Sequence, residues 1–250
     1  HFVNVSGNVR NITYRFGMGY QDEKGVLYDE YDRWNLKGAV EHKVNDKVTA
    51  GFSTNMATSL LNNGSRNSVN TGFAMTPLMK AYYWEGDKAG QPIPQPGKDP
   101  VLYPDGGGPT STLNPIIDRQ NSKVETRSND VMSNLFLQYS PISEVILKTS
   151  FAPSYRKVSR GVFYGAESEA RRNQGTNYAE NHVDDYFSYT WDTQANYIKN
   201  WGEHDLNLLG LFSVYDMKIE GSNMIVTNMP FDVAWYNMGS GAVQSQGSYF

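Results

Sequence analysis

Hydrophobic and polar residues alternate with a period of two along most of this chain. In the first clear stretch, one face would carry Ile12, Tyr14, Phe16, Met18 and Tyr20, and the other would carry Thr13, Arg15, Gly17, Gly19 and Gln21. Further alternating stretches cover residues 33–41, 48–56, 135–139, 145–155, 187–197 and 206–214. The pattern predicts β-strands with two different faces, since no helical period is sustained anywhere.

These stretches run to about ten residues, longer than the usual ~5–6 of soluble sheets and close to the ~9–11 that cross a bilayer. One face carries charges along its length, and the other carries aromatic residues at or near its ends. Such strands are typical of a barrel wall between a wet lumen and lipid. A soluble β-sandwich alternates in the same way, because its outer faces are also wet. Strand chemistry alone therefore leaves both folds open.

The connections between the strands separate these two folds. Short turns are predicted at Gly7–Asn11, Lys43–Lys47, Pro141–Glu144 and Lys199–His204, and longer links at Asp22–Glu30, Ser59–Ser128, Arg156–Asp184 and Lys218–Gln244. In an up-and-down sheet, alternate connections lie at opposite ends, so all short turns would share one end. Outer-membrane barrels have this asymmetry, with short periplasmic turns and long extracellular loops.

The sequence therefore predicts an all-β fold, an antiparallel up-and-down transmembrane β-barrel segment of about nine strands. One domain would cover residues 1–250, with long extracellular loops at about 59–128, 156–184 and 218–244. The longest link contains eight prolines and the run Gly106-Gly107-Gly108. Because proline cannot donate to a sheet ladder, this link cannot supply a central strand. We expect it to fold over a barrel mouth.

Composition narrows the possible functions. The net charge of −4 argues against a nucleic-acid partner, because no basic surplus is present to neutralise phosphates. The chain has no cysteine, so disulfides and thiolate chemistry are excluded. It also lacks a stretch of ~18 consecutive apolar residues that would form a transmembrane helix. The chain begins at His1 and ends in an apparent strand at Tyr249–Phe250, so both ends read as cuts through a longer protein.

No motif for catalysis or cofactor binding stands out. The four histidines show no metal-ligand spacing, and nucleophile-elbow, P-loop and dinucleotide-binding motifs are absent. The run Asp105–Pro109 is glycine-rich, but neither Lys-Ser/Thr nor a helical pattern follows it, so a loop is expected. We predict a protein that is not an enzyme and uses no metal or cofactor.

Two groups of residues are candidate functional sites. The aromatic residues Tyr82, Tyr83, Trp84, Trp235 and Tyr236 lie in long links, where flat rings can stack on sugars or grip peptide side chains. Packing of these rings against other loops or a partner is the alternative. A second set is predicted to face the lumen or a plug, and its mixed charges suit a hydrogen-bonded interface: Arg15, Arg33, Lys37, Asp192, Gln194 and Asn196.

Several short passages resemble the barrel of SusC/RagA-like TonB-dependent outer-membrane transporters of the Gram-negative Bacteroidetes type. They are the stretch 14–25 (YRFGMGYQDEKG), Asn114-Pro115 followed by 134–141 (NLFLQYSP), 161–165 (GVFYG), 189–192 (YTWD) and 204–207 (HDLN). Each is weak alone, but together they follow the family's order across essentially the whole chain.

The resemblance implies a barrel of about 22 strands closed by an N-terminal plug, importing oligosaccharides or peptides across the outer membrane. It also implies energy from the TonB complex through the plug, and a SusD-like surface lipoprotein as a lid. The chain shows no plug or TonB-contacting segment, so transport would belong to the longer protein. A passive porin, a siderophore-type receptor and a soluble surface β-sandwich that binds carbohydrate remain the alternatives.

Overall fold

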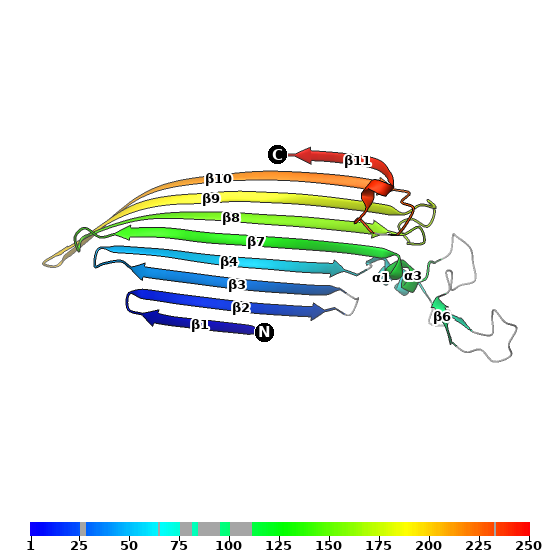
Figure 1. The fold of residues 1–250 in the computed structure, drawn as a ribbon, viewed down its shortest axis with the longest axis horizontal. Helices are drawn as coiled ribbons and strands as arrows, with labels where there is room; N and C mark the ends of the chain where they lie inside the picture. Colours follow the sequence, from blue (N-terminus) through cyan, green and yellow to red (C-terminus); the bar gives the residue numbers. More distant parts are fainter. Residues whose placement is uncertain (26–28, 65, 76–81, 85–95, 101–111, 233) are drawn as a thin grey trace.

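The computed structural model describes residues 1–25, 29–64, 66–75, 82–84, 96–100, 112–232 and 234–250. Its main feature is a nine-stranded antiparallel sheet in which each strand pairs with its neighbours in chain order (Figure 1). The strands are β1 (Phe2–Val9), β2 (Ile12–Lys24), β3 (Glu30–Lys43), β4 (Val48–Asn63), β7 (Ser122–Tyr139), β8 (Val145–Tyr164), β9 (Tyr178–Trp201), β10 (His204–Thr227) and β11 (Ala242–Tyr249). The predicted fold class and strand number are confirmed.

The remaining elements lie in the links. The link between β4 and β7 holds α1 (Arg66–Ala74), a two-stranded sheet of β5 (Tyr82–Trp84) and β6 (Pro96–Pro100), and α3 (Pro115–Gln120). The Asn114 side chain caps α3 by accepting a 3.0 Å hydrogen bond from the Ile116 amide. A 3₁₀ turn (Met238–Ser240) precedes β11. None of the described helices has the length and apolar character needed to span a membrane.

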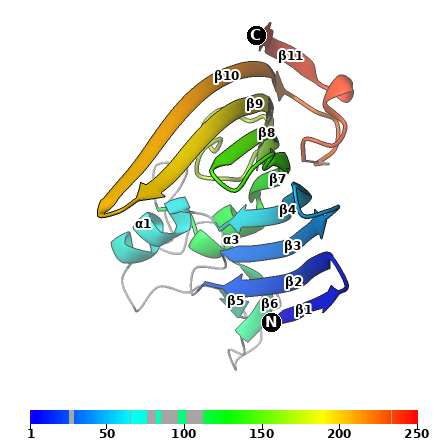
Figure 2. The ribbon, with the colours of Figure 1, turned by 90° about the vertical axis from the view of Figure 1, so that its left-hand side faces the viewer.

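Short turns gather at one end of the sheet and the larger links at the other, as predicted (Figure 1). The turns 10–11, 44–47, 140–144 and 202–203 define the short-turn end. The links 25–29, 64–121, 165–177 and 228–241 define the long-link end. The prediction was wrong about the link after β2, which is as short as the turn 140–144. Figure 2 views the sheet from its short-turn end and shows that it is bent.

The strands also extend farther into the predicted loops than expected. β7 begins at Ser122, β8 ends at Tyr164 and β9 begins at Tyr178, so the boundaries 59–128, 156–184 and 218–244 were too wide. Strands β9 and β10 have 24 residues each, although only ~9–11 are needed to cross a bilayer. Much of the excess lies at the long-link end, where polar residues such as Glu180 and Asp185 occur on both faces and the alternation that marks a strand fades.

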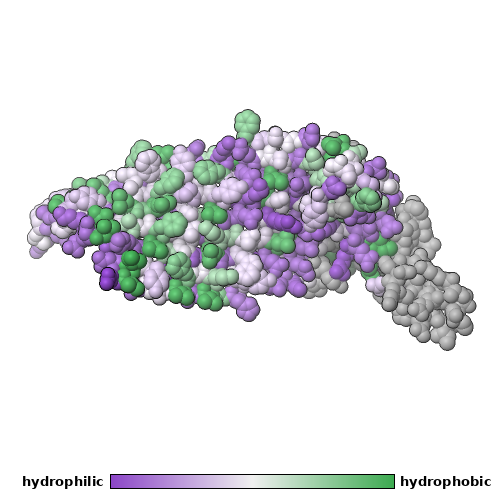
Figure 3. Space-filling model, in the orientation of Figure 1, coloured by the Kyte–Doolittle hydropathy of each residue, from purple (hydrophilic) through white to green (hydrophobic). Residues whose placement is uncertain are grey.

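One face of the sheet carries a continuous apolar belt. The register aligns these side chains across β2 to β10, and each is 41–66% exposed: Phe16, Met18, Leu36, Phe52, Met56, Leu135, Leu137, Phe151, Trp191 and Phe212. Figure 3 shows hydrophobic side chains gathered nearer the short turns, with hydrophilic ones over the long-link half. Soluble monomers rarely expose an apolar surface of this extent, so the belt indicates contact with lipid.

The buried core lies beside the links and not beneath the belt. Every buried hydrophobic residue among the described residues belongs to the long-link end: Leu113, Ile117, Val162, Phe163, Ala179, Val226, Met229, Ala234 and Met238. A β-sandwich would bury one whole face of its sheets against each other. Among the described residues, no second sheet covers the belt.

Candidate functional site

The face opposite the apolar belt, here called the polar face, carries all six residues predicted to line a lumen. Side chains of directly opposed residues point to the same side of a sheet. Lys37 opposes Gly17 on β2 and Asn55 on β4. Following the opposed pairs from strand to strand, and every second residue along each strand, identifies the other side chains on this face. The residues placed on this face are Arg15, Arg33, Lys37, Asp192, Gln194 and Asn196. That they contact a plug or water stays a prediction.

Two of these residues border a hollow of about 610 Å³ on the polar face. Arg15 and Lys37 line it together with Asn55, Asn134 and Met132, so two cations stand beside amide groups and one thioether. Nearby, the Arg33 Nε donates a 2.9 Å hydrogen bond to Asn35 Oδ1. These three cations therefore lie on this face of β2 and β3.

Acceptor groups gather on the same face at β9. Asp192 Oδ1 accepts a 2.5 Å hydrogen bond from the Ser213 hydroxyl on β10. The Asn196 Oδ1 is buried and receives no hydrogen bond from any described residue. A buried carbonyl oxygen without a donor costs free energy, so this position suits a donor from another segment. The polar face thus offers both donors and acceptors.

A cluster of rings and charges lies on the polar face at the long-link end. The rings of Tyr164 and Tyr178 stack with centroids 6.1 Å apart, and the Arg171 guanidinium lies 5.6 Å from the Tyr178 ring. The Tyr178 hydroxyl donates a 2.9 Å hydrogen bond to Glu180. Burial and then this hydrogen bond raise the pKa of Tyr178 to about 12. The hydroxyl is therefore a fixed neutral donor, and both rings are flat surfaces that can stack on a ligand.

Sequence reasoning missed this cluster. Tyr164 lies in a passage that was singled out only for its resemblance to a family, and Tyr178 fell in a predicted loop. The available signal was the period-two series Tyr178, Glu180, His182, which continues the strand upstream of Phe187. It was overlooked because the opposite face of this part of β9 is not apolar.

The predicted aromatic residues fall on separate parts of the molecule. Tyr82, Tyr83 and Trp84 form β5 in the small sheet. Tyr82 is 39% exposed, whereas the side chains of Tyr83 and Trp84 lie outside the described residues. Substrate contact by these three side chains stays a prediction.

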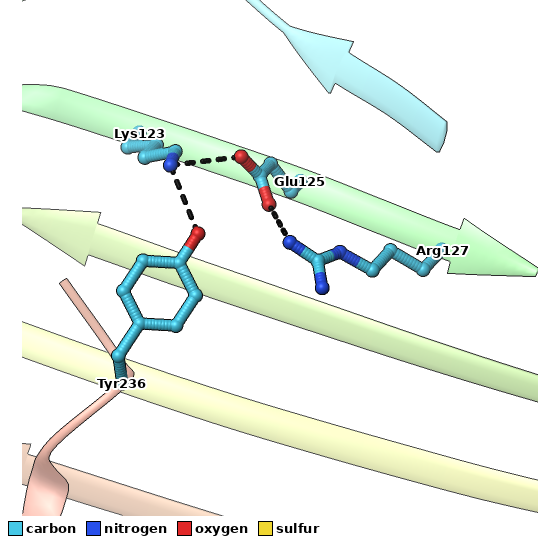
Figure 4. A network of polar contacts seen from close by, with 4 residues as sticks. All are labelled: Lys123, Glu125, Arg127 and Tyr236. Carbon is cyan, nitrogen blue, oxygen red and sulfur yellow. Dashed lines mark hydrogen bonds and ion pairs between the residues drawn. The ribbon is translucent and has the colours of Figure 1, made fainter. Parts of the chain in front are cut away.

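The other pair, Trp235 and Tyr236, packs on the face that carries the apolar belt. A β-carbon built on Gly161 of β8 would clash with the Trp235 ring, which therefore lies directly over that glycine. The Tyr236 hydroxyl accepts a 3.0 Å hydrogen bond from Lys123 of β7 (Figure 4). The Lys123 ammonium also lies 5.4 Å from the Trp235 ring. Figure 2 shows the β10–β11 link and α1 on opposite sides of the sheet. Substrate contact by this pair also stays a prediction.

The described part of the chain contains no group of three or more His, Asp or Glu side chains placed to hold a metal ion. His182 instead pairs with Asp184 at 3.1 Å, and Tyr249 of β11 donates to the same carboxylate. These contacts join β9 to β11 across Gly221, where a β-carbon would clash with the Tyr249 ring. They are structural links between strands.

Comparison with known proteins supports this architecture. No family model matches the chain. The TonB-dependent receptor P26 of Formosa agariphila is 23% identical over 167 residues, which cover 66% of this chain and 16% of that receptor. Its description is that of a receptor, not an enzyme.

Solved structures of transporters are similar to this chain in fold. A structure of the RagAB peptide transporter matches with a TM-score of 0.73 at 15% identity, covering 99% of this chain and 28% of that one. The RagAB peptide importer in its open-open state gives 0.72 at 16% identity, covering 99% and 27%. This chain thus spans under a third of these proteins. Together, the matches confirm the predicted resemblance to SusC/RagA-like TonB-dependent transporter barrels and the outer-membrane location.

Proposed function

We propose that this chain is a section of the barrel wall of a TonB-dependent importer, working within a longer protein. The observation that carries the proposal is the pairing of a lipid-type belt on one face with a polar face of balanced charge on the other, in a RagA-like fold. The long-link end is extracellular and the short-turn end periplasmic, as in other outer-membrane barrels.

The two edges of the sheet support the proposal of further strands. β1 and β11 each pair on one side only within the described sheet. Unpaired backbone groups cost several kcal/mol each in lipid, so a membrane-embedded sheet of this kind needs additional strands to close it. The complete barrel supplies these strands, and an N-terminal plug fills its lumen.

The polar face contacts this plug. Arg15, Arg33 and Lys37 supply donors to the plug, and Asp192 supplies an acceptor. Asn196 Oδ1 accepts a hydrogen bond from the plug, since no described residue donates one to it. Mixed charges suit a hydrogen-bonded plug interface better than a pore selective for one sign of charge. The TonB complex acts through the plug, and a SusD-like lipoprotein covers the extracellular mouth.

The cargo is an oligosaccharide or a peptide. One structural relative is described as a peptide transporter, and exposed rings suit either class. Tyr82, Tyr83 and Trp84 contact the cargo from the longest link, and the Tyr164–Tyr178 pair contacts it at the mouth.

Energy dependence tests the import function. In cells that produce the complete protein, we expect cargo uptake to fall to background when tonB is deleted or the proton gradient is dissipated. A passive porin would continue to equilibrate the cargo under both treatments. Uptake that persists without TonB would therefore overturn the proposal.

Ligand affinity tests the aromatic contact. We expect replacement of both Tyr83 and Trp84 by Ala in the complete protein to weaken cargo binding about tenfold, because each stacked ring contributes ~0.5–1.5 kcal/mol. Isothermal titration with the purified protein measures this. Phe231→Ala is the matched control, since Phe231 is 69% exposed on a different link. Unchanged affinity in the double variant would remove the contact from the proposal.

A further inference from the structure

A second hollow opens on the belt side of the sheet, away from the polar face. It has a volume of about 600 Å³ and lies between the end of α3, the start of β7 and the β10–β11 link. Its lining includes Asn121, Lys123, Asp232, Tyr236 and Asn237. Lys123 opposes Phe163 of β8 and has the same parity along β7 as Leu135 of the belt. The hollow is therefore not part of the lumen.

The walls of this hollow are held by buried and paired groups. The Asn177 side chain donates 3.0 Å hydrogen bonds to the Met229 carbonyl and to Asp232, and accepts one of 2.7 Å from the Met229 amide. Phe163 and Ala234 belong to the buried cluster beneath the link. The hollow thus has a defined shape before any ligand arrives.

The chemistry of the lining suits a sugar. Amide groups of Asn121 and Asn237 can both donate to and accept from ring hydroxyls. The Tyr236 ring is 59% exposed and offers an apolar face for stacking. The Lys123 ammonium adds a fixed positive charge, since the hydrogen bonds to Tyr236 and Glu125 raise its pKa. Together with the Asp232 carboxylate, this set can bind the hydroxyls of a sugar.

Cations continue from the hollow toward the belt on the same face. Arg127 lies 3.1 Å from Glu125, and Lys157 lies 3.4 Å from Asp185. The cationic side chains are 53% and 44% exposed, whereas the carboxylates are 9% and 33% exposed. Positive groups therefore stand outward, and the negative charges are recessed behind them.

The spacing of these features follows the layers of a membrane surface. Asn129, the partner of Lys157, stands two positions beyond Val131, which is in phase with the belt residue Leu135 on β7. Lys123 stands six positions farther, or about 20 Å at ~3.3 Å per residue. Acyl chains, phosphates and sugars of one lipid would meet belt, cations and hollow in that order.

We propose that the outward surface of β7, β8 and the β10–β11 link binds a phosphorylated glycolipid of the surrounding outer leaflet. The acyl chains lie on the belt, the phosphates contact Arg127 and Lys157, and a sugar enters the hollow beside Tyr236. This inference rests on the proposed placement in the outer membrane, but not on import. Carboxylates dominate the same face elsewhere, at Asp22, Glu30 and Asp32 on β2 and β3, and at Asp216 and Glu220 on β10. The phosphate contacts are therefore confined to β7 and β8.

Lipid binding to the complete, delipidated protein tests the phosphate contacts. Native mass spectrometry would count adducts as lipopolysaccharide is titrated. We expect Arg127→Gln with Lys157→Gln to weaken binding about 30-fold, because each cation near a charged leaflet contributes about fivefold. The variant leaves Glu125 paired with Lys123. The control is Arg156→Gln with Arg160→Gln, which removes two cations from the polar face of β8. Equal loss in both variants, or none in the first, would overturn the proposal.

A second variant tests the sugar site. Tyr236→Ala is expected to weaken binding of lipopolysaccharide that carries core sugars, and to leave binding of lipid A and phosphatidylglycerol unchanged. Equal weakening for all three lipids would contradict a sugar in the hollow. If Tyr236→Ala weakens cargo binding and leaves lipopolysaccharide binding unchanged, Tyr236 contacts the cargo, and the proposal is also overturned. Uptake assays on the same variants separate lipid binding from import. Abolished import with intact lipid binding would concern only the proposed import function.

Discussion

Phe151→Arg in the complete protein is expected to destabilise the membrane-folded state by about 2–4 kcal/mol, the cost of a cation at the bilayer midplane. Phe151 lies at the centre of the apolar belt, opposite Leu135 on β7 and Trp191 on β9, and is 41% exposed. In lipid this exposed ring is solvated, whereas a guanidinium there loses its water. Folding yield in outer membranes, read from the heat-modifiable band, and denaturant titration in vesicles measure the loss.

The neighbouring residue provides the control. Ser150 precedes Phe151 on the same strand but points to the polar face, where it opposes Asp192. Ser150→Arg introduces the same side chain beside a carboxylate, so we expect folding within about 0.5 kcal/mol of the parent. If the two arginine variants fold equally well, the belt does not face lipid. If only Ser150→Arg fails, the assignment of the two faces is reversed.

The part of the fold that sequence could predict is the part that lipid constrains. Within the bilayer, one side of each strand must be apolar and the other can stay polar, so the alternation around Phe16 and Phe151 is strong enough to locate strands and faces. The register then follows from opposed partners such as Met18 and Leu36. The six polar-face residues were found in this way, because each falls out of phase with the belt.

Beyond the bilayer this constraint disappears. In β9, the residues from Tyr178 to Tyr186 have polar groups on both faces, as Glu180 and Asp185 show. Water can solvate either side, so nothing in the sequence distinguishes this half of the strand from a loop. The boundaries of the long links were therefore misplaced, and the Tyr164–Tyr178 pair was missed with them.

Contacts between distant segments could not be predicted from the sequence either. Trp235 was noted only as an aromatic residue of a long link, and the structure shows that it packs over Gly161. A glycine in a strand signals close approach of another group, but it does not say which group. Likewise, Asn177 gives no sign in the sequence that its amide holds Met229 and Asp232. Only the three-dimensional arrangement shows that this link lies on the outward face.

The Gly161 position leads to the second large effect. In the complete protein, Gly161→Val is expected to displace Trp235 and to expose the β10–β11 link, because the new side chain would occupy the space of the indole ring. Overpacking of this kind costs about 1–3 kcal/mol, concentrated in the contacts that hold the link. We expect protease cleavage within residues 228–241 to become about tenfold faster or more.

A matched glycine separates this clash from a general effect of valine. Gly210 lies in β10, and a β-carbon there meets only the Ala195 carbonyl oxygen at 3.9 Å. Gly210→Val should leave cleavage unchanged, since a β-branched residue suits a strand. Combining Gly161→Val with Trp235→Ala should destabilise the link by less than the sum of the two single changes. The second change removes the ring that the first displaces. Additive effects would mean that Trp235 does not lie on Gly161. If Gly161→Val also weakens lipopolysaccharide binding while Gly210→Val does not, the hollow beside Tyr236 depends on this packing.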